Sequence, residues 1–278
     1  MSFRQLSKEL RELGEHLGAT LRRQLGARLP ERRARLFRRC RSFDAAPLLA
    51  TPVNQARIII LDTETTGLQP YAGDALVEIA MLEYRGLECT GQELCSLIHP
   101  GRHIPSASTV IHGLKDMDVV DAPSLERILD DILEFLDGAL IVGHHVGFDL
   151  RFLNRAALRH VHCRLPNPAL NTMTLFQAWT GRRGVFGLDE VARACGVPVH
   201  ERHSARADAV VCGEIFRRLA TELTDPDATV GDLLALSPPD PEYGRDYSRP
   251  LQPPGTPPPP QDSREQQQKG DTKPCAGP

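Results

Sequence analysis

The chain has 278 residues, long enough for one well-filled domain with extensions, and its hydrophobic (41%) and charged (25%) contents are those of an ordinary soluble protein. No apolar run approaches the ~20 residues that a membrane-spanning helix requires, so we expect no association with a membrane. The seven scattered cysteines form no CxxC pair, which argues against a disulfide framework and favours a reducing, cytoplasmic location. Because the net charge is −3, contact with nucleic acid requires local groups or bound cations.

Residues 1–52 are predicted to form a basic, amphipathic helical extension. Leucines recur every three or four positions from Leu6 to Leu25, the spacing of an apolar helix face, and arginines cluster between Arg28 and Arg41. The pattern fits a helix that packs on the body of the protein or on a second copy, and it also fits an arm that guides nucleic acid. A mitochondrial transit peptide is a poorer fit, because glutamates interrupt the segment.

Residues 53–225 are predicted to form one compact α/β domain. Apolar runs and turn residues predict strands at 57–62, 76–84, 92–98 and 139–142. Helical periodicity predicts helices at 124–138, 148–159, 172–179, 187–195 and 205–222. Because strands come first and helices are interleaved later, we expect an antiparallel start joined to parallel βαβ units, hence a mixed sheet covered by helices.

Residues 226–278 are predicted to be a linker followed by a disordered, proline-rich tail. Roughly half of the chain's 23 prolines lie after residue 237, and they include the run PPGTPPPP. Such a stretch buries too little apolar area to offset its ordering entropy. It is suited to local polyproline II structure and to binding an SH3-type partner, although most tails of this kind are only tethers.

The first group of candidate catalytic residues lies in the stretch RIIILDTETTGL, residues 57–68. An apolar strand runs directly into Asp62 and Glu64, and strand alternation places both carboxylates on the same side. Sheets of α/β proteins commonly open their sites at the carboxyl ends of strands. Because close carboxylates repel unless a proton or a cation neutralises them, the pair indicates a site for a hard divalent ion. The structural alternative is an acid that begins a turn beside another in solvent.

A second group lies in IVGHHVGFDLRFL, residues 141–153. An apolar strand ends at Gly143, His144 and His145 follow, and Asp149 opens a helix whose apolar side chains face inward and fix the direction of the carboxylate. An aspartate in a first helical turn also interacts favourably with the helix dipole, so a purely structural role fits as well. The histidine pair is weak support for zinc, because nearby cysteines lack ligand spacing.

The third group lies in HSARADAVVCGEIFRRL, residues 203–219. Ser204 is suited to cap a helix that starts at Ala205. His203 and Asp208 then occupy the two positions that touch across a helix start, where apolar side chains usually form a staple. An imidazole and a carboxylate in those places indicate that both face something polar.

The candidate metal ligands are therefore four carboxylates, Asp62, Glu64, Asp149 and Asp208. Four carboxylates can hold two divalent cations, Mg²⁺ or Mn²⁺, ~3.5–4 Å apart, the arrangement used for in-line displacement at phosphorus. The imidazole of His203 is suited to take a proton from an attacking water at neutral pH. These residues by themselves favour metal-dependent hydrolysis of phosphodiesters.

Three motifs resemble those of the DnaQ-like (DEDDh) 3′–5′ exonuclease family, which includes the proofreading epsilon subunit of bacterial DNA polymerase III. LDTETTGL resembles the first exonuclease motif, GHHVGFDLRFL the second, and HSARAD the third, with a histidine five residues before the last aspartate. VIHGLKDMDV, residues 110–119, resembles the segment between the first two motifs. The resemblance covers about residues 57–222 and implies a ribonuclease H-like fold, a mixed five-stranded sheet flanked by helices.

The resemblance implies an enzyme that hydrolyses DNA from its 3′ end to nucleoside 5′-monophosphates, in proofreading or repair. It implies metal ligation by the four carboxylates, with His203 as general base. Substrate contacts are implied at Thr65, Thr66, Gly67, Leu68, His112, His145 and Phe148. The family more often has asparagine at the position of His145. The implied partners are single-stranded DNA or DNA 3′ ends, and a DNA polymerase or repair complex.

Two other functions stay open at this point. An RNA 3′–5′ exonuclease or oligoribonuclease uses the same chemistry, and no residue identifies a reader of the 2′-hydroxyl. A non-catalytic nucleic-acid-binding protein of the same fold is less favoured, because all four acids and the histidine are present. The tail has no glutamine-led apolar motif of the kind that binds a sliding clamp, so both association with a replicative polymerase and the oligomeric state stay open.

Overall fold

The structure is a computed structural model that describes residues 30–237. The leucine stripe from Leu6 to Leu25, the adjoining Arg28 and the proline-rich tail after residue 237 lie outside the described residues. Within residues 30–237, every helix is too short or too polar to cross a bilayer.

Five strands form one mixed sheet, and their bounds are β1 Arg57–Thr65, β2 Leu76–Arg85, β3 Glu88–Leu97, β4 Leu140–Gly143 and β5 Ala169–Asn171. The order across the sheet is β3-β2-β1-β4-β5, antiparallel from β3 to β1 and parallel from β1 to β5. This confirms the expected mixed five-stranded sheet with its antiparallel start. The sequence pattern predicts four of the strands and misses β5, because three residues are too few to show an alternation.

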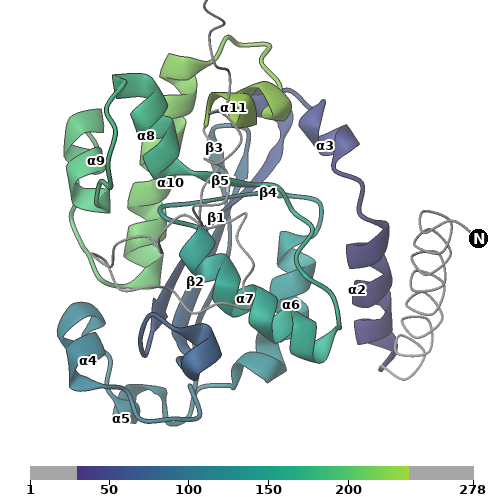
Figure 1. Ribbon diagram of the computed structural model, residues 1–278, viewed down its shortest axis with the longest axis vertical. Coiled ribbons are helices and arrows are strands. Elements are labelled where there is room, and N and C mark those ends of the chain that lie inside the picture. The colour runs from purple at the N-terminus through teal and green to yellow at the C-terminus, as the bar shows by residue number, and fades with distance from the viewer. Residues whose placement is uncertain (1–29, 238–278) are drawn as a thin grey trace, which may run out of the picture.

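Helices cover both faces of this sheet (Figure 1). Their bounds are α6 Leu125–Leu136, α7 Gly147–His160, α8 Thr172–Thr180, α9 Leu188–Cys195 and α10 Ala205–Leu223. All five begin and end within two residues of the predicted ranges. The core on one face joins the sheet to α6 and α7, and the core on the other joins it to α8, α9 and α10. The fold is the expected ribonuclease H-like one.

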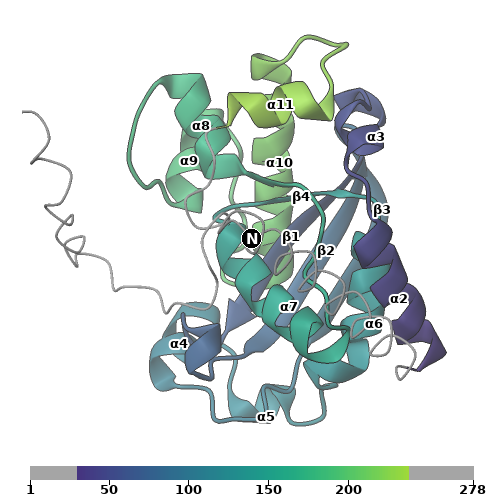
Figure 2. The same ribbon diagram turned by 45° about the vertical axis from the view of Figure 1, so that its right-hand side comes forward.

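Side chains of β1 alternate between these two cores. Ile60 packs in the core on the α10 side, and Leu61 packs in the core under α6 and α7. Continued alternation directs Asp62 and Glu64 toward α10, and Thr63 toward α7. Figure 2 shows α7 in front of the strands and α10 behind them, so the end of β1 lies between the two helices. The strand therefore presents polar groups to both.

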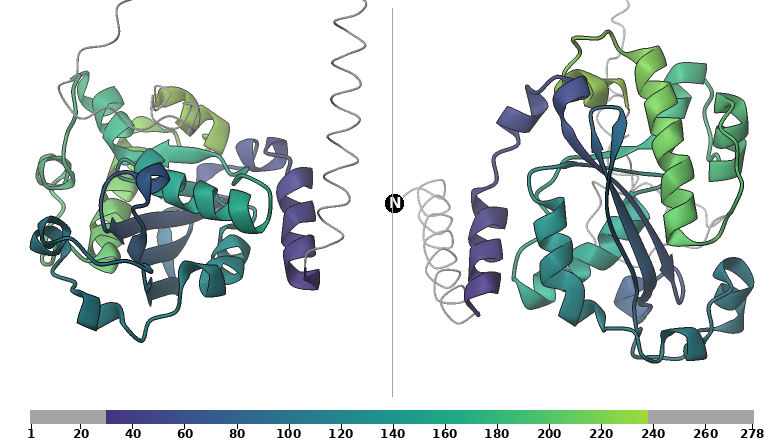
Figure 3. Two further views of the ribbon diagram at one scale, coloured as in Figure 1. Left: turned by 60° about the horizontal axis from the view of Figure 1, so that its bottom comes forward. Right: turned by 180° about the vertical axis from the view of Figure 1, so that it is seen from behind.

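The helix α2, Glu31–Ser42, lies alongside α6 (Figure 3). Its arginines form ion pairs with acids of α6 and of the residue that follows it: Arg32 with Asp131 and Glu134, Arg33 with Asp130, Arg35 with Glu134, and Arg39 with Asp137. Buried apolar side chains complete the contact. For these residues the structure matches the interpretation of a helix packed on the body. Helix α3 (Ala46–Leu49) and a 3₁₀ turn, η1 (Val53–Gln55), then lead into β1.

The remaining short elements are η2 Pro70–Ala72, α4 Ser106–His112 and α5 Asp116–Val119. The turn η2 lies between β1 and β2, and the helices α4 and α5 lie between β3 and α6. Both α4 and α5 carry apolar side chains on their outer surface, and Val110 is 85% exposed. Short helices with outward apolar residues have no clear amphipathic period, which is why the sequence pattern does not predict them.

Helix α11, Val230–Leu236, packs on the core past the boundary placed at residue 225. Val230 and Leu233 are fully buried among residues of the α10-side core. The segment before it pairs with the chain that enters β1, where the Val53 amide donates to the Ala228 carbonyl at 2.8 Å. The boundary at 225 is therefore too early, because burial of these two side chains makes residues 226–236 part of the folded body rather than a linker.

Candidate active site

Three of the four predicted metal ligands meet at the carboxyl end of β1. One carboxylate oxygen from each of Asp62, Glu64 and Asp208 lies within 4.8 Å of the others. The first two come from the α10-facing row of β1, and Asp208 comes from the first turn of α10. Asp208 is buried, whereas the two β1 carboxylates are partly exposed. The cluster is thus open to solvent on one side.

Capping interactions fix the start of α10. The Ser204 hydroxyl accepts from the Ala207 amide at 3.3 Å, as the sequence predicts, and the Glu78 carboxylate accepts from the Ala205 amide at 3.0 Å. The contact expected between His203 and Asp208 is made by the histidine backbone, whose amide donates to the carboxylate at 3.3 Å. His203 is an exposed residue, and its backbone has a positive φ of 65°. The backbone of His203 therefore lies at the edge of the cluster, and its side chain is open to solvent.

Asp149 stands next to the three clustered carboxylates but is not one of them. It lies buried in the first turn of α7, and its carboxylate accepts a hydrogen bond from the Thr63 hydroxyl. Its charge acts on Asp62, whose pKa it raises. Sequence reasoning missed the role of Thr63, although its place between two acids on the opposite face of β1 is a usable signal.

Electrostatic repulsion within this group favours a bound cation. Burial, followed by the charges of Asp149 and Asp208, raises the pKa of Asp62 well above its ordinary range. Burial, followed by the charges of Asp208 and Glu78, raises the pKa of Glu64 to about 8. Glu64 also stands directly opposite Glu78 in the β1–β2 pair, an unfavourable like-charge arrangement. All the donors are hard oxygens, so the residues present fit Mg²⁺ or Mn²⁺.

Arg202 partly neutralises the cluster, and sequence reasoning did not identify it. Its guanidinium forms an ion pair with Asp208 and donates through Nε to the Asp189 carboxylate at 2.6 Å. The positive charge lowers the pKa of both β1 carboxylates, but burial and the neighbouring acids outweigh it. The sequence does not distinguish an arginine that pairs with a site carboxylate from the many surface arginines that precede helices.

The turn after β1 is held by its own hydrogen bonds. The Thr65 hydroxyl donates to the Gly67 carbonyl at 2.7 Å, and the Thr66 hydroxyl accepts from the Ala75 amide at 3.0 Å. A Cβ on Gly67 would come within 2.4 Å of a carboxylate oxygen of Asp74, so a larger residue there would displace that side chain. Both threonines are buried, so what the turn offers a ligand is its backbone and the 62%-exposed side chain of Leu68.

His112 ends α4 with its ring buried against the turn. Its Nδ1 accepts from the Leu114 amide at 3.1 Å, and its buried Nε2 has no hydrogen-bond partner among residues 30–237. Burial lowers the pKa of His112, and the nearby backbone of Thr65 only partly offsets this. A neutral ring with an unused nitrogen beside the turn fits the implied contact with a nucleotide.

The two histidines after β4 have different roles. His144 bonds to the Thr172 hydroxyl through Nδ1 (3.0 Å) and to the Phe186 carbonyl through Nε2 (2.9 Å), and burial, with the charge of His145 second, lowers its pKa to about 3. It is a structural, neutral histidine. His145 has φ 59°, a region that histidine and asparagine occupy more often than most residues. The departure from asparagine therefore keeps the backbone shape. Partly exposed Phe148 packs on Phe152, with ring centroids 5.2 Å apart.

A family model described as Exonuclease matches residues 59–216, more than half of the chain. The chain belongs to this exonuclease family. The matched range runs from β1 into α10 and contains every carboxylate of the cluster, Asp149 and His203. This confirms the resemblance to the DnaQ-like exonucleases and establishes that the fold is that of a nuclease.

Among curated relatives, the chain is 36% identical over 179 residues to a DNA polymerase III subunit epsilon-like protein of Rhodobacter capsulatus, covering 63% of this chain and 25% of that one. It is 32% identical over 192 residues to a DNA polymerase III subunit epsilon of Rickettsia conorii, covering 65% and 84%. Among solved structures, E. coli exonuclease I in complex with a dA16 oligonucleotide matches with a TM-score of 0.53 at 16% identity, over 61% of this chain and 41% of that one. This last likeness concerns the fold alone.

The raised pKa values of these carboxylates predict how the stability of the metal-free protein depends on pH. Since the pKa values of Asp62, Glu64 and Asp149 are raised, the folded protein binds more protons than the unfolded chain between about pH 4 and pH 8. Stability in EDTA is therefore expected to fall as pH rises through this window. Divalent cations bind the deprotonated carboxylates, so the gain in melting temperature from Mg²⁺ is expected to widen from pH 5 to pH 8.

Thermal unfolding at several pH values, in Mg²⁺ and in EDTA, measures this effect. Glu64→Gln removes one of the mutually repelling charges and is expected to flatten the fall in EDTA. Asp232→Asn, far from the cluster in the capping box of α11, is the control that should keep the wild-type pH slope. A gain from Mg²⁺ that stays equal at every pH is the result that contradicts the electrostatic account.

Proposed function

We propose that the protein is a 3′–5′ exonuclease that hydrolyses DNA from the 3′ end to nucleoside 5′-monophosphates, in proofreading or DNA repair. The observation that carries the proposal is the meeting of Asp62, Glu64 and Asp208 beside Asp149, from three elements far apart in the chain. Carboxylates that repel one another in a partly exposed cluster make a site for cations, and cations allow an acidic site to accept a phosphate.

Asp62, Glu64, Asp149 and Asp208 would hold two divalent cations, Mg²⁺ or Mn²⁺. When bound, such ions supply positive charge to the attacking and leaving oxygens of a phosphodiester. The residues of the chain would set the position of these charges. The Thr63 hydroxyl fixes Asp149, and the cap of α10 fixes Asp208, so both carboxylates are oriented before substrate binds.

His203 would act as the general base. Its side chain is exposed, and the hydrogen bond from its amide to Asp208 holds its backbone at the edge of the cluster. The imidazole would take a proton from the water that attacks the terminal phosphodiester. An ordered left-handed backbone at this residue limits the positions from which the ring approaches the site.

The terminal nucleotide would lie on the turn after β1. Because the hydroxyls of Thr65 and Thr66 serve the turn itself, contacts would come from their backbone, from Gly67 and from the exposed side chain of Leu68. The free nitrogen of His112 would meet the nucleotide from α4. Two further side chains at the start of α7 would contribute to this surface, His145 and Phe148.

Product ladders from 5′-labelled oligonucleotides test the proposal. We expect single-stranded DNA to shorten from its 3′ end in Mg²⁺, a mismatched 3′ end in a duplex to be removed, and EDTA to stop both. Faster loss of a matched RNA would instead support the RNA exonuclease. DNA binding without release of nucleotide in Mg²⁺ or Mn²⁺ would support the non-catalytic protein.

The proposal also includes a protein partner, which the names of the relatives suggest. Relatives named as DNA polymerase III epsilon subunits make a DNA polymerase or repair complex the proposed partner, in the cytoplasm. The chain spans only 25% of the Rhodobacter relative and 41% of exonuclease I. Co-elution of the purified protein with a polymerase core in size-exclusion chromatography measures this association directly.

A further inference from the structure

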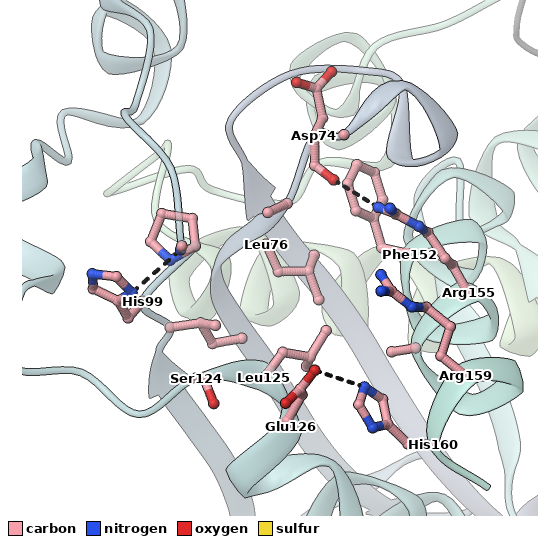
Figure 4. Close-up of a pocket in the computed structure, with 16 residues that line it drawn as sticks. Asp74, Leu76, His99, Ser124, Leu125, Glu126, Phe152, Arg155, Arg159 and His160 are labelled. Carbon is pink, nitrogen blue, oxygen red and sulfur yellow. Dashed lines mark hydrogen bonds and ion pairs between the residues drawn. The ribbon is translucent and has the colours of Figure 1, made fainter.

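A cavity of about 430 Å³ lies beside α7 (Figure 4). Residues 73–76, 98–101 and 124–126 form three of its walls, and α7 forms the fourth. None of the four candidate metal ligands lines it. We name this cavity the α7 pocket.

The α7 pocket is linked to the cluster by two elements. Along α7, Arg155 and Arg159 come six and ten residues after Asp149, which places them ~9 and ~15 Å further along the helix axis. The loop between β1 and β2 borders the cluster at its start and the pocket at Gly73 and Asp74. A chain-like ligand that begins at the cluster would therefore follow α7 and the β1–β2 loop to reach the pocket.

The two arginines and two acids of the pocket lining balance in formal charge, but the acids are paired with other residues. Figure 4 shows Arg155 and Arg159 projecting from α7 toward the cavity. The two acids of its lining are already engaged, since Glu126 pairs with His160 at 3.0 Å and the Asp74 carboxylate pairs with an arginine outside the lining at 2.9 Å. Within residues 30–237 neither Arg155 nor Arg159 has a carboxylate partner, and Arg155 reaches only the Asp74 carbonyl, at 3.5 Å.

The floor of the pocket is apolar. Leu76, Ile98 and Phe152 contribute to the lining and are each at most 4% exposed. A rim of two guanidinium groups over an apolar floor suits a ligand that combines an anion with a flat, weakly polar ring. A nucleotide has both parts, and arginine planes also stack on bases.

We propose that the α7 pocket binds a phosphate of the nucleic-acid strand whose 3′ end lies at the carboxylate cluster, with the adjacent base against the apolar floor. This rests on the proposed function. At the ~3.4 Å stacking rise of a strand, the separation along α7 corresponds to about three to four nucleotides from the end. The pocket thus makes binding depend on strand length, while the terminal nucleotide is held by the turn after β1.

Binding in EDTA tests the proposal without relying on hydrolysis. The variant Arg155→Gln/Arg159→Gln is compared with Arg85→Gln/Arg193→Gln, which removes the same charge from exposed positions outside the pocket. For a 5′-fluorescein-labelled dT12, fluorescence anisotropy is expected to show about tenfold weaker binding for the pocket variant alone. Its salt slope is expected to fall by ~0.7 for each phosphate that the variant no longer neutralises. Equal affinities and slopes for the two variants would overturn the proposal.

Substrate length separates the pocket from the catalytic cluster. In Mg²⁺ the pocket variant is expected to raise the KM for dT12 while leaving kcat/KM for a dinucleotide unchanged, since a dinucleotide is too short to reach the pocket. An equal loss for both substrates would place the arginines in the catalytic machinery and sink the inference. Failure of wild-type hydrolysis would count against the proposed function alone, because the anisotropy arm stands by itself.

A third arm distinguishes a strand phosphate from a free anion. Thymidine 5′-monophosphate and inorganic phosphate are titrated separately into wild type and the pocket variant by calorimetry. We expect dT12 to lose affinity in the pocket variant more than either small anion does. If only the small anions lose affinity, the pocket takes a free product rather than the strand, and the proposal is wrong.

Discussion

Replacing Asp208 with asparagine is expected to lower the rate of DNA hydrolysis on the order of 10³-fold or more, because one of the four proposed metal ligands loses its charge while its shape is kept. The Mg²⁺-dependent gain in thermal stability should shrink in the same variant, since the carboxylate belongs to the group that lies within 4.8 Å. Rates from a 5′-labelled single strand and melting curves with and without Mg²⁺ measure the two effects.

Asp189→Asn is the matched control for this variant. Asp189 supplies the second carboxylate that contacts Arg202, yet it lies on α9 and is not in the cluster. Because it is an exposed ion-pair partner, its replacement is expected to change the rate within about threefold. Turnover of Asp208→Asn comparable to that of wild type would refute the assignment of the site.

Replacing His203 with alanine is expected to lower kcat by ~10²–10⁴-fold while Mn²⁺ affinity is retained, because the proposed role of the imidazole is to accept a proton and not to bind metal. The amide that bonds to Asp208 belongs to the backbone and survives the substitution. Single-turnover rates with a DNA oligonucleotide, together with Mn²⁺ titration by calorimetry, separate loss of the base from loss of the metal site.

Two further variants separate base chemistry from backbone geometry at this position. His203→Asn keeps a residue that tolerates φ 65° but has no basic ring, so we expect it to be as slow as the alanine variant. His200→Ala removes an exposed histidine from the same segment and should retain the wild-type rate. Recovery of most activity by asparagine would show that His203 acts through the backbone and would rule out the general base.

Much of the fold follows from local patterns in the sequence. The alternation in β1 and the helical periods of α6 and α10 reflect burial on one face or on both, and burial leaves a period that can be read from one segment alone. Elements without such a period escape prediction. β5 is too short, and α11 is held by two side chains whose core partners lie elsewhere in the chain.

Local sequence patterns likewise predict some features of the candidate site and not others. The direction of Asp62 and Glu64 follows from strand alternation, and the place of Asp208 in the first turn of α10 follows from the cap at Ser204. The spacing places His203 and Asp208 at two positions that touch across that helix start, with both side chains facing something polar. In the structure the backbone amide of His203 makes the contact, and the same carboxylate also pairs with Arg202, a residue with no sequence signature of its own.

The sequence by itself determined which chemical groups are present and which way each points within its own strand or helix, since those depend on neighbours a few residues away. Only the tertiary structure decided the hydrogen bond from Thr63 to Asp149, the ion pair of Arg202, the packing of α11 and the existence of the α7 pocket. Each of these joins segments distant in the chain, and their approach depends on how whole helices pack on the sheet, which no single segment encodes.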